Sequence, residues 1–177
     1  MKATRRRAII VGAVGAAVAG GFLGAGLAGY RINVTPSYPV GLWRVSPLSR
    51  PAEVGDLVLI CPPASEIFER AKERGYLLGG PCPGWIAPLI KKIVAVAGQQ
   101  IDVGAAIRID GRLLPHSDLR AADAGGRPLI AYSGGVVPAG FLFLHSEFEG
   151  SYDSRYFGPV PAAGVIGLAQ PVLTFGG

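Results

Sequence analysis

The sequence LIKKIVAV at residues 89–96, followed by Ala97 and Gly98, decides the fold class of this 177-residue chain. It is rich in β-branched residues and ends at a turn signal, which is typical of a β-strand. Successive side chains of a strand point to opposite faces of its sheet, so Lys91 and Lys92 point in opposite directions. One of these lysines can reach solvent, while the other is driven into apolar surroundings.

Several other short strands are expected around this one. Residues 107–114, IRIDGRLL, hold Asp110 and Gly111 between two flanks of alternating polarity, which is a strong signal for a type I′ β-hairpin. Residues 31–46 are interrupted by Pro and Gly, and we expect a loop or an edge strand there, not a helix. Apolar segments predict further strands at residues 57–61, 141–144 and 165–173, and residues 117–135 are expected to form a loop.

One helix is expected outside the N-terminal segment, at residues 65–75. Ser65 suits the N-cap position, Glu66 and Glu69 lie in the first turn, and Gly75 ends the helix. The chain also contains 27 Gly and 15 Pro, a composition that disfavours a helical bundle. Short strands with turn signals and one small helix therefore predict a mainly β domain.

The N-terminus carries most of the excess positive charge. Four of the 17 Lys and Arg residues lie within residues 1–7, which leaves 13 basic residues against 12 acidic ones in the rest of the chain. A nearly neutral domain has no basic surface to follow a phosphate backbone, so nucleic acid is not an expected partner.

Residues 8–29 form an uncharged run of 22 residues after this basic tail. As a helix, the run would be about 33 Å long, enough to cross a bilayer core of about 30 Å. Positive charge before the run predicts that residues 1–7 are cytoplasmic and that residues 30–177 form a domain on the other side. The alternative is a cleaved secretory signal, because 14 of the 22 residues are Gly or Ala and the run is only weakly apolar.

Cys61 and Cys82 are the only cysteines. An even number of cysteines in a domain expected outside the cytoplasm predicts a disulfide. A nucleophilic cysteine is the alternative, but both residues adjoin proline in turn-like segments.

The candidate catalytic groups are few. His116 and His145 are the only histidines, and no Cys or Glu cluster stands at metal-ligand spacing, so no metal or other cofactor is expected. A Ser-His-Asp triad would need one of these histidines, which follow a hairpin and end a strand. A buried lysine is the other possible base, because burial lowers the pKa of an ammonium group toward neutrality. The alternative is that Lys91 and Lys92 both extend to water.

Four segments resemble the TraF-type conjugative-transfer signal peptidases, a branch of the type I signal peptidase superfamily with a Ser/Lys dyad. They occur in the family's order and cover most of residues 31–168. The segments are NVTPSYPVGLW at residues 33–43, GDLV at 55–58, IKKIVAVAG at 90–98 and SYDSRYFGPV at 151–160. The resemblance implies that Ser37 is the nucleophile and that Lys91, not Lys92, is the general base.

Four further residues match supporting positions of the family. Thr35 matches a hydroxyl that helps to hold the oxyanion, and Ser151 matches a serine that orients the lysine. Asp153 and Arg155 match charged residues that brace the site, and a purely structural ion pair is an equal alternative. Tyr38 departs from general secretory signal peptidases, which usually have Met after the nucleophile, and it favours the conjugation branch.

The resemblance also implies a fold, a location and a function. It implies a signal-peptidase-like coiled β-sheet domain with one small helical insertion, periplasmic and anchored in the bacterial inner membrane by residues 8–29. The expected function is a membrane-anchored serine endopeptidase that processes a pilin-like or other preprotein of a conjugative transfer system, the preprotein being membrane-tethered. A general type I signal peptidase and a non-catalytic membrane-anchored β scaffold are the alternatives.

Overall fold

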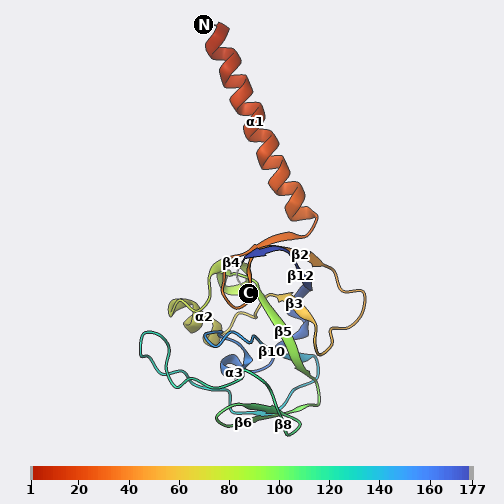
Figure 1. The fold of residues 1–177 in the computed structure, drawn as a ribbon, viewed down its shortest axis with the longest axis vertical. Coiled ribbons are helices and arrows are strands. Elements are labelled where there is room, and N and C mark those ends of the chain that lie inside the picture. Colours follow the sequence, from red (N-terminus) through yellow and green to blue (C-terminus); the bar gives the residue numbers. More distant parts are fainter. Residues whose placement is uncertain (1, 176–177) are drawn as a thin grey trace.

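The computed structural model describes residues 2–175, without the side chains of residues 2–5 and 8. A long helix, α1 (Lys2–Leu27), projects from a mainly β domain (Figure 1). Its part Ile9–Leu27 has a mean hydropathy of 1.9 and makes no buried contact with the domain, so it is long and apolar enough to cross a membrane. The helix extends further toward the N-terminus than the expected anchor and includes most of the basic tail.

The connection between α1 and the domain is short and fixed. Only two residues separate α1 from the first strand, β1 (Tyr30–Asn33). Gly29 has a φ of 87°, and its carbonyl accepts a hydrogen bond of 2.8 Å from the Val45 N–H. A Cβ atom at Gly29 would lie 2.3 Å from the Val45 carbonyl oxygen, so only glycine suits this junction. Strand β1 therefore starts after a connection of only two residues to the end of the apolar helix α1.

Seven strands form the main sheet in the order β1-β2-β12-β3-β5-β10-β11, and all their pairings are antiparallel. Beside β1, its strands are β2 (Val40–Ser46), β3 (Leu57–Ile60), β5 (Leu89–Val96), β10 (Phe141–His145), β11 (Val160–Pro161) and β12 (Val165–Phe175). The prediction of a strand at residues 89–96 is confirmed. β5 pairs with β3 on one side, where Val58 is opposite Lys91, and with β10 on the other, where His145 is opposite Lys92.

A smaller antiparallel sheet lies at the end of the domain away from α1 (Figure 1). Its order is β8-β7-β6-β9, with β6 (Gln100–Val103), β7 (Ile107–Ile109), β8 (Arg112–Leu113) and β9 (Gly135–Val136). Asp110 and Gly111 join β7 to β8, and both have a positive φ, of 49° and 77°. The predicted type I′ hairpin is therefore confirmed.

The expected helix is α2 (Glu66–Glu73), with Ser65 at its N-cap position. Phe68 and Ala71 bury its inner face in the main core. This segment ends in β4 (Gly79–Cys82), and a disulfide joins Cys61 to Cys82 with a Cα–Cα distance of 5.4 Å. The disulfide prediction is confirmed, and the helical insertion is closed at its base.

The structure differs from the sequence-based expectation in several elements. Strands β4, β6, β9 and β11, each of at most four residues, were not expected. Residues 31–46 do not form one loop or edge strand, because β1 is the edge strand and β2 lies inside the sheet between β1 and β12. The prolines occupy the connecting loop, where no ladder hydrogen bond is required of them. A second helix outside α1, the one-turn α3 (Ser154–Phe157), was not expected, and four residues are too few for a periodic signal.

Candidate active site

Ser37 lies in the loop of residues 34–39 that joins β1 to β2. Its side chain is partly exposed, and its carbonyl oxygen accepts a hydrogen bond of 2.5 Å from Ser146 Oγ. Ser146 is buried directly after β10, so this bond ties the loop to the other half of the sheet. The hydroxyl of Ser37 thus sits on a loop that is held from two sides.

Lys91 points from β5 toward this loop. Its Nζ atom lies 3.2 Å from Ser37 Oγ and donates a hydrogen bond of 2.5 Å to Ser151 Oγ. The Lys91 side chain is buried, whereas that of Lys92 is exposed. The structure therefore brings together Ser37, Lys91 and Ser151, three residues that the family resemblance selected.

Burial changes the proton affinity of this lysine. Loss of solvation is the main cause that lowers the pKa of Lys91 from 10.5 to about 8, since a buried ammonium group loses its hydration. Asp153 opposes this effect by favouring the charged form, and Arg155 adds to it by disfavouring that form. A lysine with a pKa near 8 is partly neutral at physiological pH, and only the neutral amine can accept a proton.

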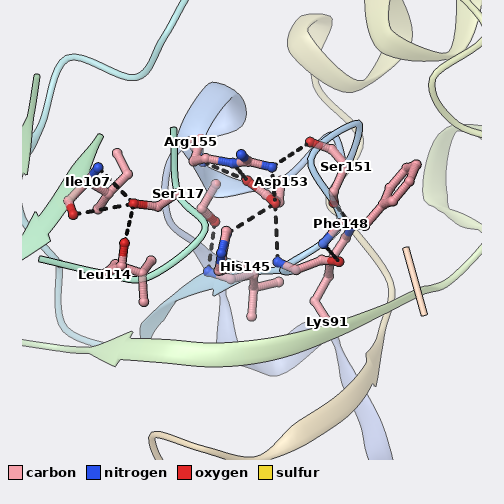
Figure 2. Close-up of polar contacts among 12 residues, drawn as sticks. Lys91, Ile107, Leu114, Ser117, His145, Phe148, Ser151, Asp153 and Arg155 are labelled. Atoms are coloured by element: carbon pink, nitrogen blue, oxygen red, sulfur yellow. Dashed lines mark hydrogen bonds and ion pairs between the residues drawn. The ribbon is translucent and has the colours of Figure 1, made fainter. Parts of the chain in front are cut away.

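Behind Lys91 lies a buried ion pair between Asp153 and Arg155. Arg155 Nε and Nη2 donate hydrogen bonds of 2.9 and 3.0 Å to the two carboxylate oxygens of Asp153, and Nη2 also donates one of 3.0 Å to the Ser151 carbonyl oxygen. Figure 2 shows Asp153 between Arg155 and His145, with Ser151 and Lys91 beside this group. The pair therefore holds the backbone of the residue whose hydroxyl contacts Lys91.

Asp153 has further buried neighbours. The Ser146 N–H donates a hydrogen bond of 3.2 Å to Asp153 Oδ2, and His145 Nδ1 lies 3.4 Å from the same oxygen. Burial raises the pKa of Asp153, but His145, Arg155 and Lys91 outweigh it and lower the pKa to about 2. The carboxylate is thus ionised at neutral pH and supplies the negative charge of the site.

Sequence reasoning missed His145 and Ser146 as members of this group. His145 is 2% exposed, and neither of its ring nitrogens has a hydrogen-bond partner of good geometry among the described residues. The sequence showed His145 only as a residue at a strand end and as one of two possible bases of a Ser-His-Asp triad. Its location beside Asp153 depends on the pairing of β10 with β5, which no local pattern reveals.

Thr35 lies in the loop of Ser37, as predicted, but its hydroxyl is already engaged. Thr35 Oγ1 donates a hydrogen bond of 2.8 Å to Asn33 Oδ1. A hydroxyl has one proton to donate, so this proton is not directed at an incoming substrate. Its predicted role as an oxyanion donor stays a prediction.

An open groove of about 780 Å³ runs past these residues. Ser37, Lys91 and Ser151 line it, together with apolar side chains that include Leu59 and Ile90. An extended peptide could reach the Ser37 hydroxyl from this groove. Within residues 2–175, no group of three or more His, Cys, Asp or Glu side chains is placed to hold a metal ion.

Known proteins similar to this chain include several transfer proteins. A probable conjugal transfer protein TraF of Sinorhizobium fredii is 58% identical over 147 residues, covering 83% of this chain and 78% of the relative. A conjugal transfer protein TraF of Agrobacterium fabrum is 52% identical over 172 residues, covering 96% of this chain and 98% of the relative. A plasmid transfer protein TraF of Escherichia coli is 42% identical, covering 84% of this chain and 85% of the relative.

A solved structure also aligns with this chain, at low similarity. A signal peptidase I from Enterococcus faecalis V583 aligns with a TM-score of 0.41 and 19% identity, over 67% of this chain and 97% of that chain. The family model described as "Signal peptidase, peptidase S26" matches residues 3–174. Since this match spans almost the whole chain, the protein belongs to the signal peptidase family, peptidase S26.

Proposed function

We propose that this protein is a serine endopeptidase with Ser37 as nucleophile and Lys91 as general base. The observation that carries the proposal is the buried Lys91 amine, 3.2 Å from Ser37 Oγ, with its pKa lowered to about 8. A base must be within hydrogen-bond reach of the proton that it takes and must be unprotonated when it acts. Lys91 meets both requirements, and among the described residues no histidine forms a hydrogen bond with Ser37.

The reaction follows from these positions. Neutral Lys91 takes the proton of the Ser37 hydroxyl while Oγ attacks the carbonyl carbon of the scissile bond. The Ser37 N–H stabilises the oxyanion, and Lys91 returns the proton to the leaving amine. Water then attacks the acyl-enzyme while Lys91 accepts a proton from it, and Lys91 passes that proton to Ser37 Oγ as the second product leaves.

The substrate that we propose is a membrane-tethered preprotein of a conjugative transfer system, such as a pilin-like subunit. The transfer role is supported by the names of the relatives in Sinorhizobium, Agrobacterium and Escherichia. Membrane tethering is supported by the position of the dyad, because Ser37 follows the end of α1 by only ten residues. A substrate held in the same membrane would meet Ser37 at high effective concentration.

We further propose a single-pass topology in the bacterial inner membrane. Residues 1–7 would be cytoplasmic, residues 8–29 would form the anchor, and residues 30–177 would form a periplasmic peptidase domain. The basic residues before Ile9–Leu27 support this orientation. The Cys61–Cys82 disulfide supports an oxidising compartment for the domain.

The test is co-expression of the full chain with a candidate prepilin, followed by intact-mass measurement of the prepilin. Wild type is compared with Ser37→Ala and Lys91→Ala, both of which must be present in the membrane in equal amount. Cleavage by wild type only supports the dyad and the substrate class together. If the prepilin stays intact but a general secretory precursor is cut, the conjugative substrate is wrong and the peptidase is right. If a folded wild type cuts neither, a non-catalytic scaffold is the better description.

A further inference from the structure

Asn33, the last residue of β1, uses its whole side-chain amide to organise the loop that carries Ser37. It is 9% exposed. The two N–H groups of its amide are shared among three carbonyl oxygens of the loop, and its amide oxygen accepts from two donors of Thr35. The three donated bonds reach Thr35 O at 3.0 Å, Tyr38 O at 2.9 Å and Pro39 O at 3.1 Å, and the two accepted bonds come from Thr35 N at 3.1 Å and Thr35 Oγ1 at 2.8 Å.

The loop needs such a partner because it cannot satisfy its own backbone. Pro36 and Pro39 have no N–H group to donate. In the part of the chain that the structure describes, residues 34–39 form no hydrogen bond from backbone to backbone. Carbonyl groups that lack a backbone partner are paired with a side chain or with water. Asn33 therefore replaces the internal hydrogen bonds that hold an ordinary turn.

The other hydrogen bonds to the loop do not hold the segment before Ser37, which is held by Asn33. Trp43 Nε1 donates a hydrogen bond of 3.0 Å to the Pro39 carbonyl oxygen, and Ser146 Oγ donates one to the carbonyl oxygen of Ser37. Neither bond reaches the segment that leads into Ser37. Among the described residues, Asn33 alone joins Thr35, before the serine, to Tyr38, after it, by hydrogen bonds.

We infer that Asn33 is a positioning residue, which together with Thr35 holds Ser37 Oγ within reach of Lys91. The inference rests on the proposed function of this dyad. Asn33 and Thr35 form one unit, since Thr35 gives both its N–H and its hydroxyl proton to Asn33 Oδ1. Thr35 thus acts on Ser37 through the shape of the loop, and the Ser37–Lys91 distance depends on both residues. A displacement of the nucleophile by about 1 Å can lower the rate about 100-fold.

The test uses the full chain in detergent and two readouts. One is the split between kcat and KM on a peptide that spans the cleavage site of the preprotein. The other is labelling by a fluorophosphonate, which counts reactive Ser37 and allows kcat to be given per active site. Asn33→Asp is the main variant, because it keeps the acceptor for Thr35 and loses the donors to three carbonyl oxygens. We expect kcat per site and the labelling rate to fall about 100-fold, with KM changed by less than about 3-fold.

Asn33→Ala is the second variant, in case the aspartate prevents folding. Gln99→Glu is the matched control, because Gln99 is also an amide that holds a turn. It accepts a hydrogen bond of 3.0 Å from the Val96 N–H and donates one of 2.8 Å to Asp110. Gln99 is not among the residues that line the groove. We expect this control to keep wild-type kcat per site.

A double-mutant cycle tests whether Asn33 and Thr35 act as one unit. We expect Thr35→Val with Asn33→Ala to cost no more than the more severe single change, and Thr35→Ser to restore activity. If the two single losses of activity multiply in the double variant, Asn33 and Thr35 do not act as one unit, because Thr35 would then act directly on the substrate. Asn33 variants with kcat per site within about 3-fold of wild type would overturn the inference as a whole. A folded wild type that is neither labelled nor active would contradict the proposed function itself, and the inference with it.

Discussion

Lys91 and Lys92 are adjacent in β5 but lie on opposite faces of the sheet. Lys91 is 3% exposed and faces Ser37 and Ser151, whereas Lys92 is exposed to solvent. Strand alternation required this opposition but could not say which lysine faces inward. The fold decides it: Lys91 is opposite Val58, which is buried in the main core, and its Nζ atom reaches Ser37 and Ser151.

This opposition predicts different effects of the same substitution at two neighbouring positions. We expect Lys91→Met to abolish cleavage, with a loss of at least about 10³-fold, because the methionine cannot accept the Ser37 proton. Lys92→Met is the control, and we expect it to retain activity within about 3-fold. Prepilin cleavage in membranes measures both. The reverse result would mean that Lys92 is the base and that Lys91 has a structural role only.

The lowered pKa of Lys91 predicts the pH dependence of the reaction. The base acts in its neutral form, so kcat/KM rises with pH and levels off above about 8, the pKa of Lys91. An unperturbed lysine would give a rise that continues toward pH 10.5. Peptide cleavage measured over the range from about pH 6 to about pH 10 tests this profile. A histidine base would give a midpoint near about 6.5, and such a result would contradict the dyad.

Asp153 is expected to set the position of that profile. Its negative charge raises the pKa of Lys91, so removal of the charge in Asp153→Asn lowers that pKa further and shifts the rising limb to lower pH. The same change leaves Arg155 buried without its carboxylate, which costs about 3–5 kcal/mol of stability. The pH profile is therefore measured per active site, counted by fluorophosphonate labelling. A destabilised variant with an unshifted profile would assign Asp153 a structural role only.

The disulfide gives a prediction about stability. Cys61 and Cys82 are separated by 21 residues in a segment that includes α2, and closing a loop of this size stabilises a fold by about 3 kcal/mol. We expect Cys61→Ser with Cys82→Ser to lower the thermal midpoint while leaving cleavage at room temperature largely intact, because neither cysteine lines the groove that holds Ser37 and Lys91. Thiol labelling of denatured, unreduced wild type is expected to find no free thiol. Two labelled thiols would contradict the bond.

Several strands were predictable because they have a local cause, whereas the short strands β4, β6, β9 and β11 were not predicted. The apolar run at residues 89–96 and the Asp110-Gly111 hairpin are visible in short windows, and the structure has them where the patterns place them. The segment at residues 31–46 was harder, because two prolines masked the short strands β1 and β2 on either side of the loop. β2 is an inner strand because it pairs with both β1 and β12, and this pairing depends on the tertiary fold.

The candidate site was predictable from the family resemblance and not from local pattern. Ser37, Lys91 and Ser151 are far apart in the chain, and only the fold brings them within hydrogen-bond distance. The buried surroundings of Asp153 could not be predicted, because His145 reaches it only through strand pairing. The role of Asn33 was equally hidden, since an asparagine at a strand end has no special signal in sequence.

Lys91 finally predicts a conflict between activity and stability. The charged form of Lys91 is disfavoured by burial in the native state, so at neutral pH the lysine destabilises the fold by at most on the order of 3 kcal/mol. We expect Lys91→Met, which fills the same space without charge, to raise the thermal midpoint at pH 7. Between about pH 8 and pH 10.5 the native protein has lost this proton while the unfolded chain retains it, so wild type gains stability and the difference narrows. Thermal unfolding by circular dichroism at pH 7 and pH 10 measures the effect. A methionine variant that is less stable than wild type at both pH values would show that the hydrogen bonds of Lys91 to Ser37 and Ser151 outweigh the burial of its charge.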